Sequence, residues 1–324
     1  MKRSAFCLVC VALLLPLISP TRAEGQDRVT IHLKWLHSAQ FAGLYAAEAN
    51  GLFASAGLDV ELVEGVATDE VLLGVSNGIY DFVLADTSRH LRTVSRGFRN
   101  VAVAAVFQID PVVLFALPES GIRRAEDLVG KRIMSFPSSY VIQAVLGRVG
   151  VSLGDVELGP PSFDLSELYS GAYDVWSGYV TDEVLRARTS GHDVNVIYPT
   201  DYGLHLYGDV LITRRGLVET NPDLVQRVVE AMVLGWSWVL DNVEEAALLV
   251  ADWAPDLDPL DQLATLRASL PFVHAGEFGL GAMTDEKWSG MAVTMAQFGL
   301  LPEDFDPTVA YTLEFVQFLY PLVR

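Results

Sequence analysis

The chain has 324 residues, of which 51% are hydrophobic and 19% are charged, and its formal net charge is −19 at pH 7. This composition can build a folded core and excludes a disordered or collagen-like chain, while so acidic a surface argues against nucleic-acid binding because it repels phosphates. The length exceeds what one compact core usually holds, so it predicts two lobes or domains.

The first 23 residues have the pattern of an export signal. Lys2 and Arg3 precede an uncharged apolar run at 5–18, and residues 21–23 place small side chains at the −3 and −1 positions of a cleavage site. A chain that starts at residue 24 would keep 19 of the 22 basic residues and all 41 acidic ones, a net charge of −22.

The two cysteines, Cys7 and Cys10, both lie inside this signal. We therefore expect the mature chain to hold no disulfide, thiol nucleophile or thiolate metal site. Too little apolar sequence precedes Cys10 for lipid attachment, so no lipoprotein is expected. Past residue 23, no uncharged apolar run approaches the ~20 residues of a spanning helix, although the mean hydropathy is +0.32. These features predict a soluble mature protein in the periplasm.

From residue 29 onward, short apolar runs alternate with helix-length amphipathic runs, as in α/β proteins. The first series predicts strands at 29–36, 58–63, 80–85, 101–107 and 112–117, and helices at 39–56, 68–77 and 88–97. The second predicts strands at 132–136, 156–158, 174–179 and 194–198, and helices at 125–129, 140–149, 165–169 and 183–189. A strand at 207–213 follows, and the chain is then expected to be almost wholly helical from Asn221 to its end.

The two series resemble each other. Residues 77–83 (NGIYDFV) are echoed by 170–176 (SGAYDVW), and residues 58–62 (LDVEL) by 154–158 (GDVEL), at offsets of 93 and 96. Chance or common α/β patterning would explain the echo as well as duplication does, but two duplicated lobes fit better than one long sheet.

The expected organisation is a signal peptide at 1–23, a first lobe at 24–115 and 208–324, and a second lobe at 116–207. Two crossovers are expected near 111–117 and 202–213. A cleft between paired α/β lobes, with strand ends and helix N-termini pointing into it, is a typical ligand site.

Catalytic and metal motifs are absent or misplaced in the sequence. Residues 74–78 match G-x-S-x-G, but a helix is expected before the Ser and a strand after it, which indicates a helix C-terminus instead of a nucleophile turn. The six histidines are scattered without an H-E-x-x-H, and no P-loop or G-x-G-x-x-G follows a strand. We expect no catalytic residues, no metal site and no cofactor.

Aromatic and hydroxyl side chains gather where predicted strands end, which suits a planar heterocycle held by stacking and directed hydrogen bonds. Any one of them could instead be a core aromatic or an ordinary helix cap. The candidates are Trp35, His37 and Phe41 after the first strand, Asp86 and Thr87 at a helix start, Phe136, Ser138 and Ser139 at another, Tyr179 and Asp182 after a strand, and Tyr202 and Tyr207 on the second crossover.

The motif LKWLHSAQFAGLYAA at 33–47, followed by GLF at 51–53 and AGLDV at 56–60, strongly resembles the thiamine-precursor group of periplasmic solute-binding proteins. This group includes thiamine pyrimidine synthases and alkanesulfonate- and riboflavin-binding relatives. Residues 162–163 (SF), 202–209 (YGLHLYGD) and 221–225 (NPDLV) agree in the same order. The resemblance implies the two-lobed periplasmic-binding type II fold with a hinged cleft and a helical C-terminal region, and it adds Gln40 and Asp209 to the ligand-binding candidates.

The synthase branch of this family uses pyridoxal phosphate, iron and a cysteine-rich loop, and this sequence departs from it because no cysteine lies beyond residue 10. We therefore expect no enzyme. The expected function is the binding component of an ABC importer for a small heterocycle. The first expectation for that ligand is a thiamine-related pyrimidine, with riboflavin or a sulfonate as alternatives. Its expected partners are that ligand and an ABC permease, with the protein itself a monomer. A pyrimidine synthase and a ligand sensor that docks to a separate membrane receptor remain the alternatives.

Overall fold

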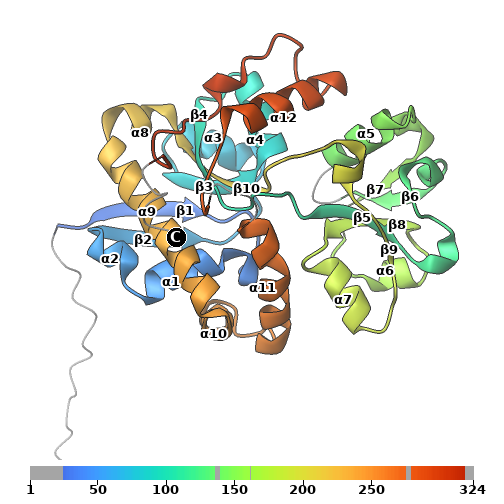
Figure 1. Cartoon of the computed structure of the whole chain (residues 1–324), viewed down its shortest axis with the longest axis horizontal. Helices are drawn as coiled ribbons and strands as arrows, with labels where there is room; N and C mark the ends of the chain where they lie inside the picture. The colour runs from blue at the N-terminus through green and yellow to red at the C-terminus, as the bar shows by residue number, and fades with distance from the viewer. Residues whose placement is uncertain (1–24, 136–138, 161, 275–278, 318–324) are drawn as a thin grey trace, which may run out of the picture.

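The computed structural model describes residues 25–135, 139–160, 162–274 and 279–317, and Figure 1 shows them as two lobes, each built around its own β-sheet. The expected signal at 1–23 and the candidates Phe136 and Ser138 lie outside the described residues. No helix among the residues described is both long and apolar enough to cross a membrane.

The first lobe contains a five-stranded sheet in the order β2-β1-β3-β10-β4. Strands β1, β2 and β3 run parallel, and β10 lies antiparallel between β3 and β4. Helices cover both faces, and each face has its own apolar cluster. The strands are β1 (Asp27–His32), β2 (Leu58–Val63), β3 (Phe82–Asp86), β4 (Asn100–Ala105) and β10 (Asp209–Arg214). The helices of one face are α1 (Ala42–Ala49), α2 (Leu52–Ser55), α8 (Arg215–Thr220), α9 (Pro222–Asp241), α10 (Val243–Trp253) and α11 (Pro259–Val273), and those of the other are α3 (Asp69–Ser76), α4 (Thr87–Ser95) and α12 (Asp285–Gln297).

The second lobe repeats this plan with the order β7-β6-β8-β5-β9, in which β5 runs antiparallel between β8 and β9. Its strands are β5 (Val112–Ala116), β6 (Arg132–Met134), β7 (Glu157–Gly159), β8 (Val175–Tyr179) and β9 (Asn195–Ile197). Its helices are α5 (Ser139–Arg148) on one face, and α6 (Ser166–Tyr169) and α7 (Glu183–Thr189) on the other. Short 3-10 helices complete both lobes at Ala39–Phe41, Pro118–Ser120, Ala125–Leu128, Leu153–Asp155, Pro199–Tyr202 and Pro307–Val309.

The echoed sequence segments occupy equivalent places in the two sheets. Asp81, just before β3, accepts a hydrogen bond from the backbone N–H of Thr30 in β1 (3.1 Å). Asp174, just before β8, accepts one from the backbone N–H of Arg132 in β6 (2.9 Å). Each carboxylate thereby ties the start of one parallel strand to its neighbour before the strand ladder begins, which fixes the register of the pair.

The helices α1 and α9 approach closely because glycines lie where they cross. A Cβ atom on Gly235 would come within 2.1 Å of the carbonyl oxygen of Gly43, and one on Gly43 would overlap the indole of Trp236. Close packing leaves no room for even one methylene at such a crossing. This close contact holds α1 against α9. It thereby fixes the position of the turn that precedes α1.

Most predicted elements are present, with three differences. The helix expected at 39–56 is divided, because Gly51 adopts a left-handed φ of 66° between α1 and α2. Strand β1 ends at His32, four residues before the predicted end, so Trp35 lies in the turn that follows. Beyond α12, the only helical segment in the described residues 298–317 is the 3-10 helix at 307–309, so the expectation of helix to the chain end is wrong there.

Two crossover segments connect the sheets and lie side by side. The backbone N–H of Gly208 bonds to the oxygen of Phe107 (2.9 Å), and that of Asp110 bonds to the oxygen of Leu206 (3.1 Å). The limits expected from the sequence, 115/116 and 207/208, lie beside these crossovers, while the strand pairing places Val112–Ala116 in the second sheet. A pair of adjacent short segments is the arrangement about which two lobes can rotate as rigid bodies.

We predict that His90 makes the fold sensitive to mild acid. The side chain is fully buried on α4, its Nε2 donates to the carbonyl of Ala310 (2.6 Å), and burial lowers its pKa from 6.5 to about 4. The unfolded chain therefore takes up this proton at a higher pH than the folded chain. Above pH 6.5 the titration of His90 leaves the free energy of unfolding unchanged. As the pH drops toward 4, it lowers that free energy by about 3 kcal/mol, because each pKa unit of the shift corresponds to about 1.4 kcal/mol.

The variant His90→Gln keeps a donor for Ala310 but cannot titrate. In urea unfolding at pH 7, 6, 5 and 4, wild type should lose about 3 kcal/mol more stability than this variant over the range. Parallel pH dependences for the two chains would contradict the prediction.

Candidate ligand-binding cavity between the lobes

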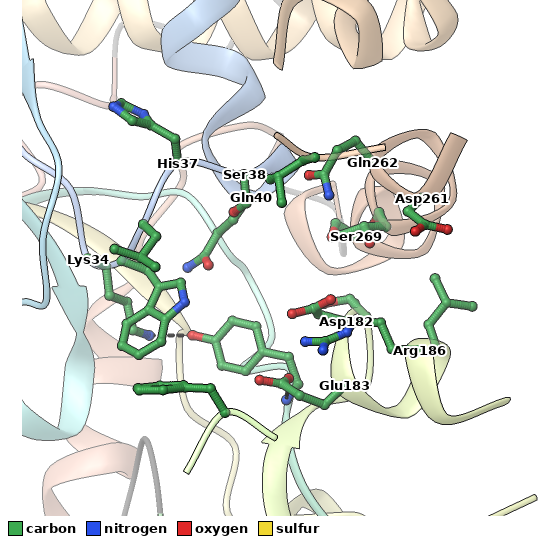
Figure 2. Close-up of a pocket in the computed structure, with 18 of the residues that line it drawn as sticks. Lys34, His37, Ser38, Gln40, Asp182, Glu183, Arg186, Asp261, Gln262 and Ser269 are labelled. Carbon is green, nitrogen blue, oxygen red and sulfur yellow. Dashed lines mark hydrogen bonds between the residues drawn. The ribbon is translucent and has the colours of Figure 1, made fainter. Parts of the chain in front are cut away.

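A cavity of about 480 Å³ lies between the two lobes. The first lobe contributes the turn after β1, the start of α4 and one side of α11, and the second contributes the end of β8 and one side of α7 (Figure 2). Its lining includes Lys34, Trp35, Gln40, Asp86, Arg89, Phe163, Tyr179, Asp182, Glu183, Arg186, Asp258, Asp261 and Gln262.

Backbone hydrogen bonds hold the turn after β1 against the cavity. The N–H of Leu33 donates to the oxygen of Val63 (2.8 Å), and the N–H of Ala67 donates to the oxygen of Lys34 (3.0 Å). Trp35 is thereby held at the cavity wall, where its ring centroid lies 5.3 Å from that of Phe163 in the second lobe. The two rings are tilted by 54°, and Phe163 is 64% exposed, so two aromatic rings from opposite lobes meet at the cavity.

Lys34 joins the lobes at the base of the cavity. Its ammonium donates to Asp209 Oδ1 (2.8 Å) on β10 and to the hydroxyl of Tyr179 at the end of β8 (Figure 2). The three side chains are 7%, 1% and 8% exposed, in the order Lys34, Asp209, Tyr179. Burial alone would lower the pKa of Lys34, but Asp209, Tyr179, Asp86 and Asp110 together outweigh it and hold the pKa well above the usual value. The ammonium is therefore charged, and it is bound by both lobes at once.

Two further polar groups of the first lobe meet this cluster. Gln40 Nε2 donates to Asp209 Oδ2 (2.5 Å). Asp86 caps α4 through the backbone N–H of Arg89 (2.7 Å), and Arg89 also pairs with Asp69 (2.7 Å). Burial would raise the pKa of Asp86, but Lys34 and Arg89 lower it below its usual value. The charges of Lys34 and Arg89 are therefore compensated by the carboxylates of Asp209 and Asp69.

Carboxyl groups line the far wall, where α7 faces α11. Burial raises the pKa of Asp182, and the nearby Asp261 of the other lobe raises it further. Burial and the neighbouring Asp182 raise the pKa of Glu183 to about 7, although Glu183 accepts the backbone N–H of Tyr179 (2.7 Å). Figure 2 shows Asp182 and Glu183 opposite the α11 residues Asp261 and Ser269.

Six of the predicted candidates line the cavity: Trp35, His37, Gln40, Asp86, Tyr179 and Asp182. The imidazole of His37 is directed away from the others (Figure 2) because its Nδ1 bonds to the hydroxyl of Tyr45 (2.9 Å) and its ring packs on Trp253. Asp209 does not line the cavity and lies behind Gln40 and Lys34. Ser139 begins α5.

The four remaining candidates lie away from the cavity lining. Phe41 is buried in the core under α1, and the hydroxyl of Thr87 donates to the oxygen of Tyr207 (2.8 Å). Tyr207 packs on Trp288, and its own hydroxyl accepts the N–H of Thr284 (3.0 Å). Tyr202 accepts the N–H of Ala125 (2.9 Å) within the second lobe.

Several lining residues were not among the candidates predicted from the sequence. Lys34 and Phe163 stand inside motifs that carried the family resemblance, so a signal for them existed. The lining residues of α11 had no such signal, because the helix lies about 70 residues or more from every second-lobe residue of the lining. Within the described ranges, no group of three or more His, Cys, Asp or Glu side chains is placed to hold a metal ion.

The fold and the interlobe cavity define a two-lobed protein of the periplasmic-binding type. The structure is similar to that of the alkanesulfonate-binding protein SsuA from Xanthomonas axonopodis pv. citri bound to MOPS, with a TM-score of 0.70, 18% identity, and coverage of 88% of this chain and 98% of that one. At this identity the similarity establishes the fold.

A family model described as NMT1/THI5 like matches residues 38–246, and the chain belongs to this family. It is 27% identical to the riboflavin-binding protein RibY of Chloroflexus aurantiacus over 93% of this chain and 91% of that protein. It is also 27% identical to the formylaminopyrimidine-binding protein of Halalkalibacterium halodurans over 69% of each.

We predict that Tyr179→Phe loosens the contact between the lobes. The variant keeps the ring but removes the hydroxyl that Lys34 reaches across the interface, a hydrogen bond to a charged group that contributes about 1.5–3 kcal/mol. Without ligand, small-angle scattering should show a larger radius of gyration than for wild type. Tyr202→Phe is the matched control, because it removes a hydroxyl bonded within the second lobe. Equal radii for wild type and Tyr179→Phe would contradict the prediction.

Proposed function

We propose that the protein is the solute-binding component of an ABC importer and captures a planar nitrogen heterocycle of the pyrimidine type, free or fused. The observation that carries this proposal is the pair Trp35 and Phe163, two aromatic rings from opposite lobes beside hydrogen-bonding groups in one cavity. Flat rings are held by stacking while a few polar groups fix their orientation. The riboflavin- and formylaminopyrimidine-binding relatives support the same ligand class.

The charges of the cavity favour a neutral or cationic ligand over a sulfonate. Five carboxyl groups line it (Asp86, Asp182, Glu183, Asp258 and Asp261) against three cations (Lys34, Arg89 and Arg186). Lys34 and Arg89 are already paired with Asp209 and Asp69. Arg186 is then the remaining cation beside Asp182, Glu183, Asp258 and Asp261, so an anion would meet more carboxyl groups than cations, which costs free energy in a cavity that is partly shielded from water.

We propose further that the protein is exported to the periplasm, acts as a monomer, delivers its ligand to an ABC permease and performs no chemistry on it. The resemblance to binding proteins and the absence of cysteine beyond residue 10 support a binder over a pyrimidine synthase. A ligand sensor that docks to a separate receptor would use the same cavity, and co-purification with a permease or with a sensor kinase would separate the two.

The ligand should be recoverable unchanged. Mass spectrometry of material released by unfolding the purified protein is expected to show a pyrimidine-type heterocycle. Incubation of the ligand-free chain with pyridoxal phosphate and ferrous iron should yield no pyrimidine. In a separate experiment, addition of the released compound should reduce the radius of gyration as the lobes close. Release of an aliphatic sulfonate would contradict the proposed ligand class. Formation of a pyrimidine by the chain would contradict the proposal that the protein only binds its ligand.

Trp35→Ala should weaken heterocycle binding by roughly 1–3 kcal/mol, the range for loss of one ring stack. Its fold stability should fall by less than the roughly 3–5 kcal/mol of a buried Trp, because Trp35 is only half-buried. Calorimetric titration and thermal melting of the same variant measure the two effects. Trp238→Ala is the control, a half-buried Trp on α9 outside the cavity lining, and its affinity should be that of wild type. Normal affinity of Trp35→Ala with a large drop in Tm would place Trp35 in the core instead.

A further inference from the structure

The buried carboxylate of Asp209 decides which end of the Gln40 amide faces the cavity. Gln40 Nε2 donates to Asp209 Oδ2 (2.5 Å), and a carboxylate can only accept hydrogen bonds. The reverse orientation of the amide would place two oxygens against each other. Gln40 lines the cavity, and no described residue hydrogen-bonds to its Oε1. The group left for a ligand is therefore an acceptor.

Asp209 is itself held so that it cannot turn away from Gln40. Its Oδ1 accepts from Lys34 Nζ (2.8 Å) and from the hydroxyl of Tyr179 (3.4 Å), and the side chain is 1% exposed. A buried carboxylate needs donors on both oxygens, and among the described residues Gln40 is the donor for Oδ2. Both oxygens are thus occupied, and the orientation of the Gln40 amide follows.

Lys34 supplies a donor beside this acceptor. An ammonium has three N–H groups, and described residues accept two of them, Tyr179 and Asp209. Lys34 lines the cavity, so the third can reach a ligand. The hydroxyl of Tyr179 accepts from Lys34 and donates to Asp209, so its proton is used within the protein. Figure 2 shows the amide of Gln40 and the ammonium of Lys34 on the same side of the cavity.

We propose that Gln40 is a specificity-determining residue and that Asp209 is the residue that positions it. Gln40 Oε1 and Lys34 Nζ form an adjacent acceptor and donor, which match a ring edge with an N–H donor next to an acceptor. Amino-substituted ring nitrogens and cyclic lactams have such an edge. A ring whose edge carries no N–H leaves Gln40 Oε1 unpaired on binding and is rejected. This inference rests on the proposed function and specifies the ligand class within it.

The first test needs no ligand. In nitrogen–proton correlation spectra of the native chain, the side-chain amide of Gln40, assigned by its loss in Gln40→Leu, should show one proton shifted downfield and protected from exchange. In Asp209→Asn this signal should move to the position of an ordinary exposed Gln. The amide of Gln143, which donates to the oxygen of Phe298 (3.1 Å), should stay unchanged in that variant and shows that the fold is kept. A Gln40 signal in wild type at the ordinary position would overturn the assigned orientation.

The second test measures discrimination with two probes of equal shape, 4-amino-2-methylpyrimidine and 2,4-dimethylpyrimidine. Wild type should bind the amino compound about 10- to 100-fold more tightly, the range expected when an acceptor in the cavity is left unpaired. Gln40→Leu and Asp209→Asn should each reduce the ratio to within about threefold of unity. Gln143→Leu, outside the cavity, should keep the wild-type ratio.

The outcomes separate this inference from the proposed function. A wild-type chain that binds both probes equally leaves the proposed function standing and overturns the specificity. A chain that binds neither probe overturns the pyrimidine-type ligand, and the specificity with it. A wild-type preference that survives in both Gln40→Leu and Asp209→Asn would assign the discrimination to other residues and overturn the roles of these two.

Discussion

The position of the two lobes depends on one buried ammonium. Lys34 is held by Asp209 of its own lobe and by Tyr179 of the other, and all three side chains are at most 8% exposed. Truncating one partner of a buried ion pair is costly, because the remaining charge loses its compensation. Asp209 pairs the Lys34 charge within the first lobe, and separation of the lobes takes away the Tyr179 hydroxyl. Closure is therefore coupled to a hydrogen bond of a buried charged group instead of relying on apolar contact alone.

This arrangement is possible because both lobes use the same sheet plan. In the first lobe β2 and β3 flank β1 in parallel, and in the second lobe β7 and β8 flank β6 in the same way. A strand that adjoins a crossover, β10 or β5, pairs antiparallel with β3 or β8. An Asp just before β3 or β8 accepts a hydrogen bond from the backbone of the central strand. The ends of β1 and β8 consequently meet at the cavity, where they deliver Lys34 and Tyr179. Strand β10 enters directly from the second crossover, so Asp209, its first residue, lies beside them. The cluster is thus a direct consequence of the topology.

The sequence predicted the elements better than the site, for physical reasons. Alternating apolar runs reflect local burial, and β2 and α7 begin and end at the predicted residues. Trp35 and Tyr179, two of the aromatic residues near predicted strand ends, both line the cavity, yet Thr87 and Tyr207 share the same pattern and bond to each other away from the cavity lining. Whether a polar residue faces a ligand or another part of the fold depends on pairing across the chain. Lys34 and Asp209 are 175 residues apart, and no local periodicity records such a pair.

Asp209 connects two properties of the cavity that could have been independent. Its Oδ1 serves the contact between the lobes through Lys34 and Tyr179, while its Oδ2 serves the orientation of Gln40. Substitution of Asp209 must disturb both, because residues in one hydrogen-bond network do not act additively. Tyr179→Phe and Gln40→Leu act on opposite oxygens of the same carboxylate, so the first should alter the lobe separation and the second the choice of ligand. If either variant changed both properties to the same extent, the two oxygens would have to be treated as one coupled site.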